Sequence, residues 1–218
     1  MSQNLKTLIS KLNDTTRQAA ERAASLCMAR GHHEVDMEHF LLALLEDAQG
    51  DLAVLCQRYG VSVSGLQRDL EVELSRFKVG NTRTPVFSER LPQLLEHAWL
   101  IASLESHAAR IRGVHVVLAL LTEPALSQMA HRSSPLWARF QLDELKHKMA
   151  EATRGSREAA QALQAAQAGD ALSGADSTEP AFASGGRTPA LDQFTTNLTQ
   201  RARDGQVDPV IGLSLIHI

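Results

Sequence analysis

The fold is decided by two similar stretches, HFLLALLED at His39–Asp47 and HVVLALLTE at His115–Glu123. They lie 76 residues apart, and His, Leu, Ala, Leu and Leu recur at the same places in both. A repeat of this length indicates a duplicated folding unit and not a solenoid of short repeats. Both copies are mostly apolar with an Ala-Leu-Leu end, which is typical of a buried helix. We therefore expect an all-α fold, and a duplicated helical unit favours a binding module over a catalytic site.

The composition also favours helices. The 218 residues are 44% hydrophobic but only 4% aromatic, a mixture that favours helix over sheet. The net charge of −3 at pH 7 argues against nucleic acid or an anionic membrane as the partner. No apolar run approaches the roughly 20 residues of a membrane span, and the N-terminus has no basic-then-apolar signal. Cys27 and Cys56 have no CxxC or Cys/His ligand spacing, so we expect reduced core thiols of a cytosolic protein.

The chain divides into an extra helix and two matching units. Apolar residues at helical spacing predict an amphipathic helix over Leu5–Leu12, and Asn13–Thr15 supplies cap chemistry. The first unit is expected at about 14–77 and the second at about 88–153, which together make a double-repeat domain over 1–154. Each unit reads as a long helix, the repeat-motif helix, a short helix and a closing helix. The closing helices match at Leu66 and Leu145, so three further residues enter before the second one.

The composition changes after Thr153. Residues 155–187 begin as an Ala/Gln-rich segment that favours helix, and continue as a Gly-, Ser- and Pro-containing stretch that is typical of a flexible linker. Thr188-Pro189 is a helix-start signal, and 188–212 reads as the truncated start of another module. The last six residues, LSLIHI at 213–218, fit no upstream pattern. They match the conceptual translation of a sequencing adapter, and we expect resequencing of the locus to remove them.

These parts resemble the tandem Clp N-terminal repeats, an eight-helix pseudo-twofold domain carried by AAA+ unfoldases of the Clp/Hsp100 family. TPALD at 188–192 and DPVIG at 208–212 are similar to the entry into the first AAA+ module of the same proteins. The order of repeat domain, linker and AAA+ entry is specific to this family. The resemblance covers nearly the whole chain except its last six residues and the detail of the linker.

Three features resemble the type VI secretion branch of this family, the ClpV ATPases. They are the extra helix at Leu5–Leu12, which ClpB-like N-domains lack; the first repeat at Leu26–Leu42; and the second repeat at Phe87–Arg112. The resemblance implies that the intact protein is a bacterial, cytoplasmic ring hexamer, that it uses ATP and Mg²⁺ to extract contracted sheath subunits, and that this fragment is a monomer. It also implies that the domain recognises an N-terminal helix of the larger sheath subunit.

A groove for such a helix needs apolar anchors at helical spacing. We predict that the extra helix forms one wall, that the small residues of the next helix form the floor, and that the junction between the units forms the other wall. The predicted groove residues are Leu8, Leu12, Ala19, Arg22, Ala23, Leu26, Phe87 and Leu91. Phe87 is the strongest of them, because a Phe in a breaker-rich connector is less constrained to be core. Taken singly, the leucines and alanines also fit an ordinary hydrophobic core.

No catalytic, cofactor-binding or metal-ligating residue is assigned. The chain contains no G-x-x-x-x-G-K-[ST] phosphate loop, so we expect no ATP hydrolysis from it. His32, His33 and His39 form a cluster without a full metal-ligand set, and we expect His32 and His33 to be exposed loop residues. His39 and His115 occupy equivalent places near helix starts, where an imidazole can pack and hydrogen-bond locally.

Two other functions stay open. One is the N-domain of a general Clp/Hsp100 disaggregase, which accepts varied apolar segments and needs no extra first helix. The other is a free-standing double-repeat adaptor without a motor, against which the AAA+-like stretch at 188–212 argues.

Overall fold

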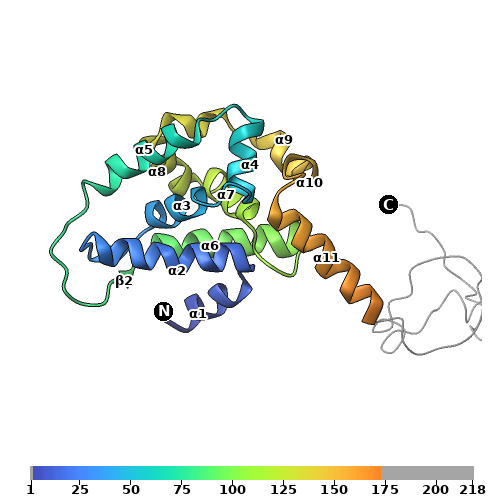
Figure 1. The fold of residues 1–218 in the computed structure, drawn as a ribbon, viewed down its shortest axis with the longest axis horizontal. Coiled ribbons are helices and arrows are strands. Elements are labelled where there is room, and N and C mark those ends of the chain that lie inside the picture. Colours follow the sequence, from blue (N-terminus) through green and yellow to red (C-terminus); the bar gives the residue numbers. More distant parts are fainter. Residues whose placement is uncertain (1, 173–218) are drawn as a thin grey trace, which may run out of the picture. The chain divides into compact units, whose positions relative to one another are not determined.

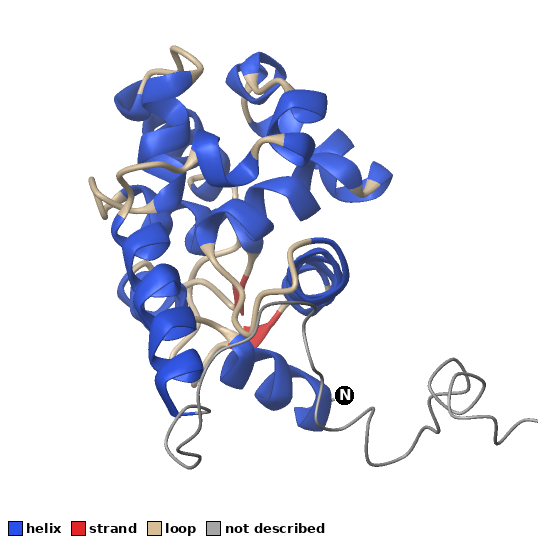
Figure 2. Cartoon of the chain, turned by 90° about the vertical axis from the view of Figure 1, so that its right-hand side faces the viewer, coloured by secondary structure: helices blue, strands red, loops and turns tan. Residues whose placement is uncertain are grey.

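The structure, a computed structural model, describes residues 2–172, and most of this part of the chain is helical (Figures 1 and 2). These residues belong to one compact unit, Met1–Gly174. The elements are α1 (Ser2–Lys11), α2 (Asp14–Ala29), β1 (Glu34–Val35), α3 (Met37–Leu45), α4 (Asp51–Arg58), α5 (Val63–Leu74), β2 (Val86–Phe87), α6 (Arg90–Leu100), the π-helix η1 (Ile101–Glu105), α7 (Gly113–Thr122), α8 (Pro124–Ser133), the 3₁₀ helix η2 (Pro135–Arg139), α9 (Leu142–His147), α10 (Met149–Ala152) and α11 (Arg157–Leu172). The expected all-α class with an extra N-terminal helix is confirmed.

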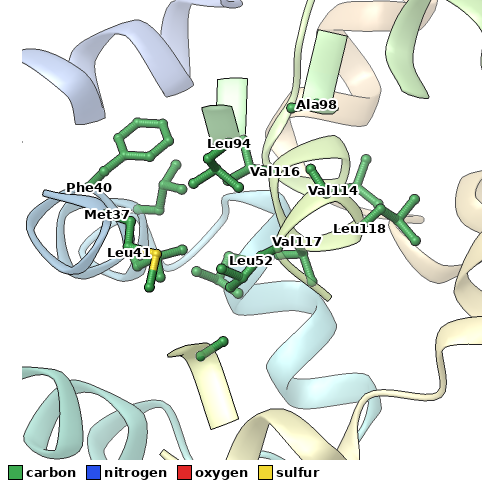
Figure 3. Packing of buried hydrophobic residues seen from close by; sticks show 14 of the residues in the cluster. Met37, Phe40, Leu41, Leu52, Leu94, Ala98, Val114, Val116, Val117 and Leu118 are labelled. Carbon is green, nitrogen blue, oxygen red and sulfur yellow. The ribbon is translucent and has the colours of Figure 1, made fainter. Parts of the chain in front are cut away.

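The duplicated sequence folds into two matching sets of helices. The first set is α2–α5; the second runs from α6 through α10. Each repeat-motif helix lies at the centre of its set, and the residues 37–45 of α3 and 113–121 of α7 are all buried. Their side chains join those of α4 and α6 in one apolar cluster (Figure 3). Full burial of each large apolar side chain stabilises the fold by about 1.5–3 kcal/mol, so these two helices contribute most of the core.

Both repeat-motif helices begin with the same histidine cap. The Nδ1 atom of His39 accepts a hydrogen bond from the backbone N–H of Asp36 at 3.1 Å, and Nδ1 of His115 accepts one from the N–H of Arg112 at 3.0 Å. The equivalent placement of these two histidines is therefore confirmed. Because Nδ1 is the acceptor, the neutral ring carries its proton on Nε2. The cap residue Asp36 adds a second bond, which its carboxylate accepts from the N–H of Met37 at 2.8 Å.

The prediction that His32 is exposed is wrong. Its side chain is buried, with Nδ1 2.8 Å from Nε2 of His39. Since Nε2 of His39 carries the proton, His39 donates this hydrogen bond. The ring centroid of Phe77 lies 5.5 Å from that of His32 and completes the cover. His33 is exposed, as expected.

The buried histidine caps predict a pH-dependent stability. Burial lowers the pKa of His115 to about 3, whereas an imidazole in the unfolded chain has a pKa of about 6.5. Below pH 6.5 the unfolded chain therefore binds a proton that the folded domain does not, and stability falls as the pH falls. We expect His115→Gln, which keeps an acceptor for the N–H of Arg112 but cannot titrate, to remove this loss. Between pH 7 and pH 5 the wild type should lose about 2 kcal/mol relative to the variant in urea unfolding.

The comparison with the variant is needed because another buried group titrates in the same range with the opposite sign. Burial and the neighbouring Asp36 carboxylate raise the pKa of Glu38 to about 7, so the folded domain keeps a proton there that the unfolded chain loses. That contribution is common to the wild type and to His115→Gln, and it cancels in the difference. A difference that does not change with pH would contradict a neutral, buried His115.

The two repeats are joined by two equivalent backbone pairings. β1 and β2 pair in parallel with Val35 opposite Phe87, and Leu12 pairs in parallel with Ile111. Leu12 and Phe87 are 75 residues apart, and Val35 and Ile111 are 76 apart. The same contact is therefore made twice, once in each direction, as a pseudo-twofold arrangement requires. The extra residue enters at η1, where the N–H of Ser106 bonds to the carbonyl of Ile101 five residues back; π-turns of this kind accommodate one inserted residue.

Helix α1 packs on α6, the first helix of the second set (Figure 1). Leu8 and Leu12 are buried in the common core. The Lys11 ammonium lies 4.8 Å from the ring centroid of Trp99, a cation–π contact. The backbone after α1 is held by Ile111, whose N–H bonds to the carbonyl of Lys11 at 2.8 Å and whose carbonyl accepts from the N–H of Asn13 at 2.9 Å. Thus α1 is an integral part of the domain.

A buried polar cluster, centred on Glu158, joins α11 to the starts of three other helices. The Glu158 carboxylate accepts hydrogen bonds from the backbone N–H of Asp51 at 2.9 Å, the N–H of Gly113 at 2.8 Å and the side-chain amide of Asn13 at 2.8 Å. The Asp51 carboxylate is held in turn by the guanidinium of Arg112 at 2.9 and 3.1 Å. A Cβ at position 113 would lie 2.8 Å from the Glu158 carboxylate, so the cluster requires glycine there.

The compact unit therefore extends past residue 154, the end of the domain predicted from sequence. Ser156 and Glu158 are both buried, and the hydroxyl of Ser156 donates to the Asp51 carboxylate. Beyond this first turn of α11 the side chains of residues 160–166 are exposed. The predicted linker beyond Leu172, the AAA+-like stretch at 188–212 and the hexapeptide at 213–218 lie outside the described residues.

Candidate functional site

Five of the eight predicted groove residues lie in the hydrophobic core. They are Leu8, Leu12, Ala19, Ala23 and Leu91, each at most 5% exposed. Ala19 and Ala23 lie on α2, which packs closely against α3, and small residues allow that close approach. The structure places these five beneath the surface, where they hold the walls of the site and offer no contact area to a partner.

The other three predicted residues reach the surface. Phe87 on β2 is 39% exposed, next to Val86 at 60%. Leu26 is half-buried, and Arg22 is exposed and forms an ion pair with Glu46 across α2 and α3. Exposed aromatic and β-branched side chains on a two-residue strand are unusual for structural residues, because they gain nothing from folding.

A further apolar stripe on α2 was not found from sequence. Ala20 and Ala24 are half-buried, and Met28 is 55% exposed. These residues follow each other at i, i+4 and i+8 on the side of α2 that turns away from α3. The signal was present in the spacing, but the adjacent stripe of Ala19, Ala23 and Cys27 has the same spacing and is the buried one. The helix α2 leads through Gly31 to β1, which pairs with β2, so the stripe and Phe87 belong to connected elements.

Two hollows open on a different side of α2, where it meets α3 and α5. The larger has a volume of about 490 Å³ and the smaller about 250 Å³. Glu46 lines both of them, and its ion pair with Arg22 lies between them. The larger is lined by Leu26, Arg30, Leu42, Glu46, Ser64, Gln67, Arg68 and Glu71. These walls mix cationic, anionic and apolar side chains, so they are less suited to an apolar helix face than the stripe is.

The described residues offer binding surfaces and no catalytic arrangement. Burial raises the pKa of the Cys56 thiol to about 12 and also raises that of Cys27, so neither is a thiolate near neutral pH. Within residues 2–172 no three His, Cys, Asp or Glu side chains are grouped to hold a metal ion. Across the same part of the chain no helix is both long and apolar enough to span a bilayer.

The sequence is similar to two groups of curated relatives. Chaperone protein ClpB of Yersinia enterocolitica is 34% identical over 95% of this chain. The AAA+ ATPase ClpV1 of Pseudomonas aeruginosa is 27% identical over 94% of it. The chain spans 23% of the length of each of these relatives.

The fold is similar to solved N-domains of ClpV. The N-domain of ClpV from Vibrio cholerae matches with a TM-score of 0.64 and 33% identity, over 71% of this chain and 92% of its own. A ClpV N-domain in complex with a VipB peptide matches with a TM-score of 0.61 and 31% identity, over 71% and 94%. A chain from a study of ClpV and the TssB–TssC sheath of type VI secretion matches with a TM-score of 0.67 and 26% identity, over 70% and 94%.

The family model of the Clp repeat (R) N-terminal domain matches residues 11–132, more than half of the chain. This range contains both repeat-motif helices, both histidine caps and the two backbone pairings that join the repeats. The chain therefore belongs to the family of Clp N-terminal repeat domains.

Proposed function

We propose that this domain recognises an N-terminal helix of the larger sheath subunit of a type VI secretion system. One observation carries the proposal: Val86 and Phe87 are exposed beside the α2 stripe, in a fold whose solved ClpV relative was captured with a VipB peptide. An amphipathic helix lays its apolar face on such a surface through anchors at i, i+3, i+4 and i+7. The stripe from Ala20 to Met28 covers eight residues, or about 12 Å of helix, which matches two turns of a partner.

The proposed role of the whole protein follows from the family. We propose a cytoplasmic ring hexamer that uses ATP and Mg²⁺ to disassemble contracted sheaths, with this domain as the recognition module. Six copies in one ring raise the effective concentration of the binding sites, so a modest affinity per domain suffices. No residue of this chain fits the ATP site, because the sequence has no Gly-Lys phosphate loop, and none is assigned to it.

The test is a titration of the purified chain against a fluorescent peptide of the sheath subunit's N-terminal helix. We expect saturable binding, and we expect Phe87→Glu to weaken it about tenfold to a hundredfold, because it places a charge in an apolar contact. Leu163→Glu is the matched control: Leu163 is 65% exposed on α11, and its replacement should leave the affinity unchanged. Absence of binding by the folded wild-type chain would refute the proposal.

The 34% identity to a ClpB chaperone keeps one alternative, a disaggregase N-domain that accepts varied apolar segments. The two functions differ in selectivity, so the sheath peptide is compared with a scrambled peptide of the same composition. Binding of the sheath peptide alone favours the type VI function, and equal binding of both favours the disaggregase. Deleting residues 1–13 cannot separate them, since Leu8 and Leu12 are core residues and their loss would unfold the domain.

A further inference from the structure

The pseudo-twofold arrangement relates two helix surfaces that differ in one respect. On the second repeat, α1 lies on α6 and leads into Leu12, which pairs with Ile111. On the first repeat the equivalent pairing is made by Phe87 with Val35, and the equivalent of α6 is α2. The chain before Phe87 is not a helix over α2. It follows the turn after α2, where the N–H of Asn81 bonds to the carbonyl of Gly31 at 2.9 Å and that of Val86 to His33 at 3.2 Å.

The exposure of the two equivalent pairing residues shows the consequence. Leu12 is fully buried, whereas Phe87 at the same place in the other repeat is 39% exposed. On the helices, an offset of 75 residues places Ala24 of α2 where α6 has Trp99. Trp99 is the residue over which Lys11 of α1 lies. The surface that α1 covers on α6 is thus repeated on α2, with smaller side chains and without a covering helix.

We propose that α2 carries an open helix seat, formed by Ala20, Ala24, Met28 and Phe87, and that the partner helix docks there as α1 docks on α6. The identity of that partner as a sheath helix rests on the function proposed above; the seat itself rests on the repeat. In this arrangement α1 is a resident helix on one repeat, and the partner supplies the matching helix on the other.

The seat also determines the chemistry of its occupant. The docking face of α1 carries Leu5, Leu8, Ile9 and Leu12, a spacing of i, i+3, i+4 and i+7, and the partner carries apolar residues at the same spacing. Because Ala24 replaces Trp99, the partner fills the missing volume with larger side chains than α1 uses, such as Phe or Met. Ala24 also provides no ring for a cation, so the partner has no equivalent of Lys11.

The test fills the seat from the side of the protein. Ala24→Trp introduces the side chain that occupies the equivalent place on α6, and we expect at least a tenfold loss of affinity for the fluorescent sheath-helix peptide. The matched control is Ser25→Trp, an exposed position one residue further along the same helix, which should change the affinity less than twofold. Circular dichroism of both variants verifies that the fold is retained. A second probe is a peptide of this chain's own residues 2–13, which we expect to bind the same seat more weakly.

The outcomes separate the two proposals. If the sheath peptide binds the wild type and Ala24→Trp equally, the helix seat is refuted while the proposed function stands. If the sheath peptide does not bind at all, the proposed function fails, and the peptide of residues 2–13 decides the seat. Binding of that peptide that Ala24→Trp abolishes and Ser25→Trp preserves supports the seat, and absence of binding refutes it.

Discussion

Replacing Glu158 with alanine is expected to destabilise the domain by about 3 kcal/mol. The carboxylate accepts three hydrogen bonds inside the protein, two from the backbone N–H groups of Asp51 and Gly113 and one from the side chain of Asn13. Alanine leaves these donors without an acceptor, and each unsatisfied buried donor costs about 1–3 kcal/mol. The loss is partly offset because the Asp51 carboxylate no longer faces a second acidic group, whose pKa it raises.

The measurement is urea unfolding followed by circular dichroism at pH 7. Gln161→Ala, at an exposed position on the same helix, should change the unfolding free energy by less than about 0.5 kcal/mol. Gly113→Ala provides an independent approach to the same cluster, because its Cβ would meet the Glu158 carboxylate at 2.8 Å. We expect it to destabilise the domain as well. A loss below about 1 kcal/mol for Glu158→Ala would show that the cluster is not a structural link.

Leu12 and Phe87 occupy equivalent places in the two repeats, yet their replacement by alanine should have opposite readouts. Leu12 is fully buried, so Leu12→Ala is expected to cost about 3 kcal/mol of stability through lost burial and a residual cavity. Phe87 is partly exposed, so Phe87→Ala should cost less than about 1 kcal/mol while it weakens binding of the partner helix. Two equivalent positions thus divide between folding and recognition.

Urea unfolding and peptide titration of the same two variants check this division. Lys6→Ala, an exposed position on α1, controls for any general effect of changing that helix. If Phe87→Ala destabilised the domain as much as Leu12→Ala does, Phe87 would be a core residue and its role in docking would be refuted.

The repeat and the caps were predictable from sequence because they are local signals. The 76-residue repeat identified α3 and α7 as equivalent helices, and the N-caps at Asn13, Asp36 and Ser62 follow from side chains that bond within three residues. The placement of His39 and His115 was predictable for the same reason. Each of these features depends on residues that are neighbours in the chain.

The parts that could not be predicted depend on residues far apart in the chain. Glu158 bonds to Asn13 across 145 positions, and nothing in an Ala/Gln-rich segment marks one glutamate as buried. His32 is covered by Phe77, which brings an apparently exposed loop residue into the interior. On α2 two alanine stripes of equal spacing compete, and only the packing of α3 decides that Ala19 and Ala23 are buried while Ala20 and Ala24 reach the surface.

The anchoring of α11 has a mechanical consequence. Its 16 residues span about 24 Å at 1.5 Å per residue, and its first turn is fixed while residues 160–166 stand free of the domain. The helix is therefore a lever arm with its fulcrum at Glu158, and a tilt of about 10° there displaces the far end by about 4 Å. A force on that end is delivered at once to the starts of α2, α4 and α7, which belong to both repeats. The two repeats then bear the load together, and neither can be peeled away before the other.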